Sequence, residues 1–309
     1  MTAIRPLSDE LQKVAIEELN EGPERLQRDI AALREWIEKQ PHLRARTDDQ
    51  FLVSFLRGCK HSLEKAKSKI DHFYTIRAML PHVFVNNTMA NAKNLMIARS
   101  GGLLVLPKTL EIGGPVIGFS RYKILFDLPI TARDLHRFTI MCADMAIVAT
   151  DEFVIGGYME IVDVDKLGVG AMSRVDPVLA KQLTTYCEKG SAIRIKGIHV
   201  INVPKEGLAA INIIRNLFPV SLKERFFVHR NVKELCKHIP KEYLPIEYGG
   251  TNGCLVDLAK YYEKLLVDFN SYFEDNDNYG VDENLRTGKI VNMNSIFGLE
   301  GSFRKLEFD

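Results

Sequence analysis

Up to about residue 90, apolar side chains recur at the three- and four-residue spacing of amphipathic helices. This spacing predicts helices over three segments: 8–19, 24–39 and 62–80. We expect a further helix to begin at Thr47, because Thr47 and Gln50 have the Thr-x-x-Gln form of a capping box. Together these elements predict a small helical domain over residues 1–92.

Around residue 100 the pattern changes to short apolar runs that alternate with helical segments. We expect strands over 103–106, 116–119, 157–163, 193–200 and 225–229. We expect helices over 131–150, 175–188, 206–218 and 231–237. This alternation predicts an α/β domain with a largely parallel sheet over 93–254. A last helix over 255–273 and a polar tail would complete a C-terminal segment, 255–309.

Composition excludes several classes of protein. The 309 residues include 41 Lys or Arg and 40 Asp or Glu, so the formal net charge is +1 and nucleic acid is not an expected partner. The five cysteines lack Cys-x-x-Cys spacing, which argues against zinc and disulfides and for a reduced, cytoplasmic compartment. No apolar run reaches the roughly 18 residues that a membrane-spanning helix needs.

Catalytic motifs are missing from the sequence. The phosphate-binding loop, the Gly-x-Ser-x-Gly elbow and the His-Glu-x-x-His zinc motif do not occur. We interpret His199, inside an apolar strand, as a core residue, and Asp163 and Asp165 as loop caps at a strand end. We therefore expect no catalytic residue, no metal ligand and no cofactor. An α/β hydrolase or another enzyme is an alternative that would need a polar triad in a cleft.

Basic residues are concentrated in one part of the chain. Segment 190–241 holds ten Lys or Arg against three Glu, whereas 255–309 holds six against eleven acidic residues. In the strand beginning at Ile193, alternation puts Arg194 and Lys196 on one face and the isoleucines on the other. This pattern favours attraction to an anionic surface. The alternative is a solvated basic face with no partner.

The helix over 206–218 is apolar around most of its circumference. Ile211, Ile214 and Phe218 form one stripe at i, i+3 and i+7, and other apolar residues extend beyond it. At about 20 Å it is too short to cross the roughly 30 Å hydrocarbon core, so at a membrane it would lie on the surface. A buried crossover helix is the equally weighted alternative.

Four stretches resemble motifs of the CRAL-TRIO family of lipid-transfer proteins, and of its tocopherol- and retinaldehyde-binding branch more than its yeast phosphatidylinositol-transfer branch. They are FLRGCK at 55–60, KGIHVINVP at 196–204, LKER at 222–225 and LPIEYGG at 244–250. The resemblance covers about residues 10–255, and tails like the GSFRKL segment at 301–306 occur in insect members. Gly58 and Cys59 depart from the family's FLRARK, so we interpret 55–60 as inter-domain packing.

The resemblance implies an apolar cavity closed by a mobile gate helix. The residues that would line the cavity are Tyr158, Val162, Val175, Leu183, Cys187, Ile193, Ile195 and Ile198. The gate residues would be Ile211, Ile214 and Phe218. The residues that would bind phosphoinositide head groups are Arg194, Lys196, Lys223 and Arg225. Ser221 stands where tocopherol transfer proteins have a lysine, which weakens the expected coupling to inositol bisphosphate.

We therefore expect a cytoplasmic, monomeric protein, in peripheral and reversible contact with membranes, that carries one hydrophobic lipid and catalyses no reaction. The cargo would be a tocopherol (vitamin E), a retinoid, a carotenoid or a similar isoprenoid, released where the gate opens on an anionic, phosphoinositide-containing membrane. One alternative is phosphatidylinositol or phosphatidylcholine exchange, which needs polar residues in the cavity for the head group. Another is a signalling scaffold with an empty domain.

Overall fold

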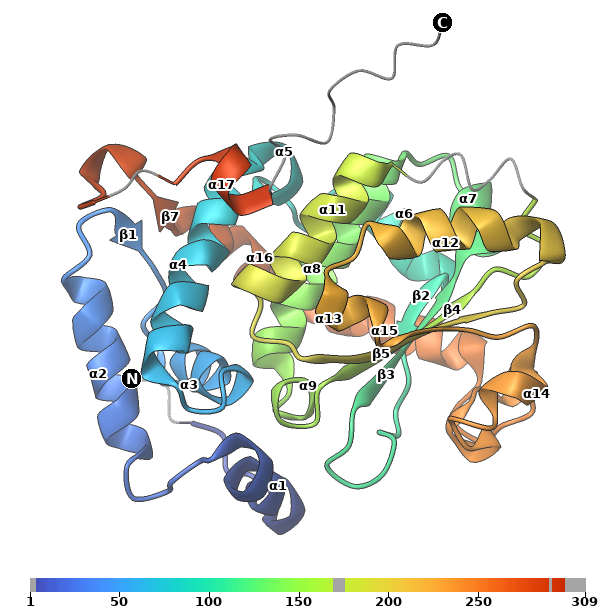
Figure 1. The fold of residues 1–309 in the computed structure, drawn as a ribbon, viewed down its shortest axis with the longest axis horizontal. Coiled ribbons are helices and arrows are strands. Elements are labelled where there is room, and N and C mark those ends of the chain that lie inside the picture. The colour runs from blue at the N-terminus through green and yellow to red at the C-terminus, as the bar shows by residue number, and fades with distance from the viewer. Residues whose placement is uncertain (1–3, 169–175, 289–290, 298–309) are drawn as a thin grey trace, which may run out of the picture.

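The structure is a computed structural model that describes residues 4–168, 176–288 and 291–297. A helical part, on the left in Figure 1, lies beside a larger part that contains a five-stranded sheet. The mixed α/β fold with an N-terminal helical part and a mostly parallel sheet is therefore confirmed. The predicted tail segment at 301–306 lies outside the described residues.

Helices build the N-terminal part, close to where the apolar spacing predicts them. They are α1 (Asp9–Leu19), α2 (Leu26–Glu38), α3 (Asp49–Gly58), α4 (Leu63–Met79) and α5 (Pro81–Phe84). The predicted capping box at Thr47 is wrong. Asp48 caps α3 by accepting a hydrogen bond from the Phe51 amide (2.9 Å), and the Gln50 side chain instead contacts Arg5 and Asp151.

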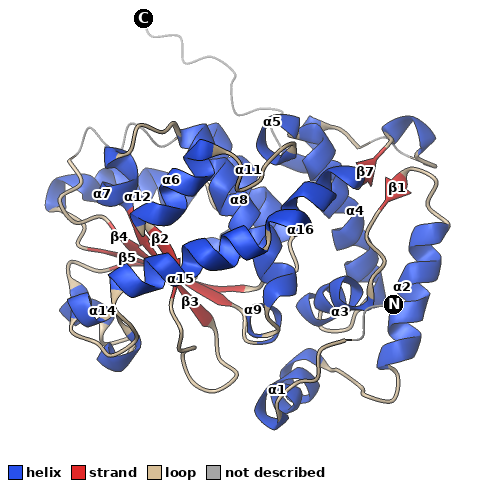
Figure 2. Ribbon diagram, turned by 180° about the vertical axis from the view of Figure 1, so that it is seen from behind, coloured by secondary structure: helices blue, strands red, loops and turns tan. Residues whose placement is uncertain are grey.

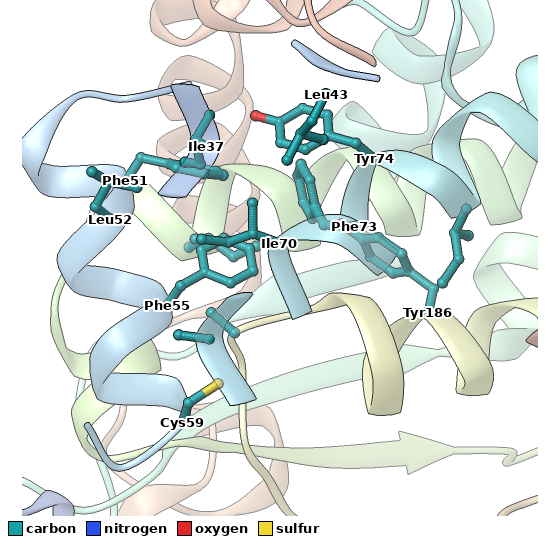
Figure 3. Close-up of a cluster of buried hydrophobic side chains, with 14 of the residues drawn as sticks. Ile37, Leu43, Phe51, Leu52, Phe55, Cys59, Ile70, Phe73, Tyr74 and Tyr186 are labelled. Carbon is teal, nitrogen blue, oxygen red and sulfur yellow. The ribbon is translucent and has the colours of Figure 1, made fainter. Parts of the chain in front are cut away.

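Aromatic side chains form the centre of this helical part (Figure 3). The Phe55 ring lies 4.8 Å from Phe51 and 5.6 Å from Phe73. Tyr186, which belongs to the sheet-containing part, joins the same cluster at 6.0 Å from Phe73 and 5.5 Å from Phe84. The apolar core is therefore continuous between the two parts, which burial of aromatic surface holds together.

The sheet has the order β2-β3-β4-β5-β6, with β2 antiparallel to β3 and the other pairs parallel. Its strands are β2 (Leu103–Val105), β3 (Val116–Arg121), β4 (Tyr158–Asp163), β5 (Ile195–Ile201) and β6 (Phe226–Val228). Parallel neighbours need crossover connections, and the intervening helices supply them.

Helix α6 (Ala92–Ser100) precedes β2. The helices between the strands of the sheet are α7 (Tyr122–Asp127), α8 (Ala132–Ala149), α9 (Glu152–Ile155), α11 (Pro177–Thr185), α12 (Leu208–Asn216) and α13 (Val220–Lys223). Short π and 3-10 turns, η1 (Tyr186–Gly190) and η2 (Lys205–Gly207), extend α11 and precede α12. In Figure 1, α8, α11 and α12 lie in front of the sheet.

Further helices follow β6: α14 (Val232–Leu235), η3 (Lys241–Tyr243), η4 (Ile246–Tyr248), α15 (Leu255–Asp268), α16 (Asn270–Asp275), η5 (Asn276–Asn278), η6 (Glu283–Leu285) and α17 (Met293–Phe297). The single helix predicted over 255–273 is two helices, because the chain turns at Phe269. In Figure 2, α15 crosses in front of the strands, and it packs against β2 and α6.

The C-terminal segment returns to the helical part. There β7 (Gly280–Val281) pairs antiparallel with β1 (Leu43–Arg44). Arg286 Nη1 also reaches Asp71 of α4 at 2.7 Å. Within the described residues, no helix combines the length and apolar character needed to cross a membrane.

Candidate functional site

An apolar cavity of about 310 Å³ lies between the sheet and the helices α8, α11 and α12. Its volume is at the lower end of the roughly 300–1,000 Å³ typical of small-molecule pockets. The sheet contributes alternate residues, as the pleat requires: Tyr158, Glu160 and Val162 of β4 all line the cavity. The geometry therefore provides an internal space for one small apolar molecule.

A bulge in β5 explains why Ile195 and Ile198, which are three residues apart, line the same wall of the cavity. Tyr158 pairs with Ile195, but the next residue of β4 pairs with Gly197, so Lys196 is an extra, unpaired residue. The side-chain alternation shifts by one there. Ile195 before the bulge and Ile198 after it consequently both line the cavity.

The structure places seven of the eight predicted cavity residues on its wall: Tyr158, Val162, Leu183, Cys187, Ile193, Ile195 and Ile198. The eighth, Val175, lies outside the described residues. The three predicted gate residues, Ile211, Ile214 and Phe218, also line the cavity, and they pack with Phe226 in one apolar cluster.

Helix α12 has apolar side chains on both its inner and its outer side. Ile211 is only 4% exposed, whereas Ile213 is 65% and Leu208 is 42% exposed to solvent. The Arg215 guanidinium donates to the backbone carbonyl of Lys223 (3.0 Å), which ties the end of α12 to α13. This helix covers the cavity and at the same time presents apolar surface outward.

Sequence reasoning missed a carboxyl group in the cavity. Glu160 is the one acidic or basic side chain among the described residues that line it. One carboxyl oxygen accepts a hydrogen bond from the Ser120 hydroxyl and the other from the Tyr158 hydroxyl. Burial raises the pKa of Glu160 to about 7, even though these two hydrogen bonds lower it.

Three of the four predicted phosphoinositide ligands lie together beside the cavity. Burial lowers the pKa of Lys196, and the positive charges of Arg194 and Lys60 lower it further. Burial lowers the pKa of Arg194 too, as does the charge of Arg225. Mutual repulsion of this kind shows that these cations are close in space. We call Lys60, Arg194, Lys196 and Arg225 the basic cluster.

Intramolecular contacts hold the predicted members of the basic cluster. The Arg194 guanidinium donates to the carbonyl of Ile155, and Arg225 Nη1 donates to the carbonyl of Ile195 (2.7 Å). Lys196 Nζ lies 3.7 Å from a carboxylate oxygen of Glu18 in α1. Exposed ion pairs of this length contribute little to stability, so Glu18 holds Lys196 only weakly.

Two lysines differ from the prediction: Lys223 was predicted as a head-group ligand, and Lys60 was not. The contact of Lys223 with Arg215 is made by its backbone carbonyl, which accepts a hydrogen bond from the guanidinium. Lys60 was not predicted, because only the left-handed turn after α3 (φ 54°) brings it to this surface. The sequence holds no local signal for that turn.

Segment 55–60 packs between the two parts of the molecule. Arg57 is buried and pairs with Glu21 and Asp151, each at 2.7 Å. A side chain at Gly58 would overlap the Ala192 carbonyl, so glycine permits the close approach of α3 to the segment before β5. The interpretation of this motif as packing between the two parts is therefore confirmed for Arg57 and Gly58.

The other polar residues singled out in the sequence have structural contacts. Asp163 Oδ1 accepts from the Asp165 amide (2.8 Å) and from the Asn202 side chain (2.8 Å), which confirms its role as a cap. His199 is buried on the face away from the cavity, and its Nδ1 lies 3.0 Å from Nε2 of His229. Burial lowers the pKa of His199 to about 4, so it stays neutral near pH 7.

Comparison with known proteins identifies the class. A family model described as CRAL/TRIO domain matches residues 99–250, and one described as Pinta-like, UBA domain matches 22–94. "Alpha-tocopherol transfer protein-like" from Homo sapiens is 32% identical over 264 residues, which are 84% of this chain and 75% of the relative. "Clavesin-1" from Pongo abelii is 27% identical over 252 residues, covering 79% of this chain and 69% of the relative.

The chain therefore belongs to the CRAL/TRIO family, whose members bind and transfer lipids. The predicted resemblance is confirmed. A crystal structure of Sfh5 aligns with a TM-score of 0.48 at 12% identity, over 87% of this chain and 99% of that one, which is too distant to support a functional argument.

Proposed function

We propose that this protein carries one small hydrophobic lipid, such as a tocopherol, a retinoid, a carotenoid or a similar isoprenoid, between membranes. The observation that carries the proposal is the apolar cavity beneath α12. Its volume suits one compact molecule better than a lipid with two long acyl chains. Each buried CH₂ group contributes about 0.8 kcal/mol, so such a cargo would escape into water very slowly. Exchange must then take place at a membrane.

Helix α12 is the proposed gate. Its exposed Ile213 and Leu208 would enter the membrane interface when the helix moves away from the sheet, and this burial would offset the loss of the inner contacts of Ile211. The hydrogen bond between Arg215 and Lys223 lies at the solvent-exposed end of the helix and would open first. The gate would thus be stable in water and open at a bilayer.

The basic cluster is the proposed contact with anionic phosphoinositides. Lys196 lies on β5, and Arg194 and Arg225 come just before β5 and β6, the strands on either side of α12 in the sequence, so binding to these residues would be linked to the gate. Lys60 joins them from the turn after α3. Each cation near an anionic membrane is worth about 1 kcal/mol, so four would support reversible, peripheral attachment. The cytoplasmic location and the monomeric state are parts of the same proposal.

We infer carriage rather than catalysis. Ser120 donates directly to Glu160, and no histidine stands between them among the described cavity residues, as a relay to a serine nucleophile would require. The phospholipid alternative finds less support, since a phosphate would lie beside the carboxyl of Glu160 with no cation lining the described wall.

Transfer between liposomes tests this function. A fluorescent tocopherol is loaded in phosphatidylcholine donors, and its arrival is followed in acceptors with or without phosphatidylinositol bisphosphate. We expect wild type to transfer faster to the phosphoinositide acceptors, and Arg225→Ala to lose that difference. Arg133→Ala, an exposed cation at the start of α8, is the matched control. Equal rates in every arm would end the phosphoinositide coupling, and no transfer in any arm would contradict carriage of this lipid class.

A further inference from the structure

The carboxyl group of Glu160 lines a mostly apolar cavity, with several hydroxyl and thiol groups close to it. Ser120 of β3 and Tyr158 of β4 hydrogen-bond to its two oxygens. Tyr122, Cys142 and Tyr262 also line the cavity, and the Glu160 charge contributes to raising the pKa of each, after burial, so they lie near it. Hydroxyl and thiol groups from five elements (β3, β4, α7, α8 and α15) thus converge around one carboxyl group.

The backbone makes room for this arrangement. Gly118 of β3 pairs directly with Glu160 in the sheet, and a Cβ atom there would overlap the Tyr158 hydroxyl and the Glu160 carboxyl oxygen. Glycine is unfavourable inside a strand, and such positions often mark a close approach. Here the missing side chain allows the hydrogen bond between Tyr158 and Glu160 to form.

The carboxyl group has hydrogen-bonding capacity that the protein does not use. An ionised carboxylate offers about four lone-pair sites, and Ser120 and Tyr158 occupy one each. No cation lines the described part of the cavity wall to compensate its charge. Leaving a carboxyl group partly satisfied in an apolar space is unfavourable, and a ligand with a matching polar group removes that penalty.

We propose that Glu160, together with Ser120 and Tyr158, binds the hydroxyl end of the cargo, which is therefore a lipid alcohol or phenol. The inference rests on the proposed function and specifies its substrate class. A hydroxyl donates to the carboxylate and accepts from the neutral acid, so it suits both forms of a group whose pKa is about 7.

Other end groups fit this subsite less well. A lipid carboxylic acid would put two acids side by side, which disfavours ionisation of both. A methyl ether or a hydrocarbon cannot donate and would leave the carboxylate unsatisfied. An ammonium group brings three donors, more than the two lone-pair sites that remain on Glu160.

Matched pairs of ligands test the proposal. The delipidated full-length protein is titrated with retinol and retinyl methyl ether, and with α-tocopherol and its methyl ether, following ligand fluorescence. The control is Glu38→Gln, which changes an exposed carboxylate on α2. In wild type and in this control, we expect the alcohol of each bound pair to bind at least about tenfold more tightly than its ether.

Variants at the subsite separate a binding role from a folding role. In Glu160→Leu the preference for the alcohol should fall to about twofold or less, while the ether binds at least as tightly as in wild type. Tyr158→Phe keeps the ring and removes one hydroxyl, so it should reduce the preference in part. A variant that only misfolds would weaken both members of a pair together.

The outcomes are distinguishable. Equal affinities for alcohol and ether in wild type would overturn this subsite and leave lipid carriage standing. Tighter binding of a long-chain amine such as sphingosine than of either alcohol would also overturn the hydroxyl assignment. Failure of all four ligands to bind would contradict the proposed function together with this inference.

Discussion

Gly118 lies directly opposite Glu160 in the parallel pairing of β3 and β4, and the absence of its side chain leaves room for the carboxyl group. The same gap accommodates the Tyr158 hydroxyl, which donates to Glu160. One small residue on a central strand therefore determines whether the hydrogen bond between Tyr158 and Glu160 can form.

Gly118→Ala should destabilise the protein by about 1–3 kcal/mol, because the added methyl group forces Tyr158 and Glu160 apart in a packed sheet. Gly280→Ala is the matched control, since Gly280 also lies in a strand but has nothing within 4 Å of its Cβ position. Its free energy of unfolding should change by less than about 0.5 kcal/mol. Urea titration measures both, and equal stability of the two variants would refute the crowding at Gly118.

Glu160 should make stability fall as the pH rises. Its pKa is about 7 in the folded protein and ordinarily 4.5, so the folded state binds more protons than the unfolded state between these two pH values. Stability contributed by the neutral acid is complete below pH 4.5 and is lost by about pH 7, a change of the order of 3 kcal/mol.

Urea unfolding of delipidated wild type and Glu160→Gln at pH 5 and pH 8 checks this effect. Glutamine cannot ionise, so the variant should gain stability relative to wild type at the higher pH. A difference between the two proteins that stays constant with pH would show that Glu160 does not titrate in this window.

Arg57→Ala should destabilise the protein by about 3–5 kcal/mol, because it leaves the buried carboxylates of Glu21 and Asp151 without their common cation. Arg99→Ala removes the exposed pair with Glu263 and should cost only about 0–1 kcal/mol. Thermal and urea unfolding of both variants measure the contrast. Similar small losses would mean that the Arg57 pairs do not hold the two parts together.

Ile213→Glu should slow lipid transfer between vesicles about tenfold without reducing stability. Ile213 is 65% exposed on α12, so a charge costs little in water but opposes insertion into a membrane interface. Val256→Glu on α15, where valine is 60% exposed, is the matched control. Equal transfer by the two variants would contradict the outward role of α12.

The sequence pattern was sufficient to identify the inner side of α12, because the spacing of Ile211, Ile214 and Phe218 reports which side of a helix faces inward. The helix itself ends at Asn216, two residues before Phe218. The alternation of side chains also predicted which residues share a face of the strand before the bulge in β5. The pattern failed at Glu160, since a charged residue within a strand normally indicates a solvent-facing position. Only the packing of helices over that face shows that it is enclosed.

Two other features depend on backbone conformation that a pattern does not report. The bulge at Lys196 reverses the alternation, and only Gly197 beside it hinted at an irregular strand. The left-handed turn after α3 brings Lys60 to the basic cluster, although nothing in the FLRGCK motif encodes that position. At the start of α3, Thr47 and Asp48 are both good caps, so sequence alone could not choose between them.

The most direct measurement of the central claim is the mass of the intact protein as purified under mild conditions, followed by organic extraction and lipid mass spectrometry. The account predicts one non-covalent lipid per chain, bearing a free hydroxyl group, that is absent from Val162→Trp, in which the indole fills the cavity beside Glu160. A protein that carries no lipid, and takes none from vesicles offered to it, would contradict the account.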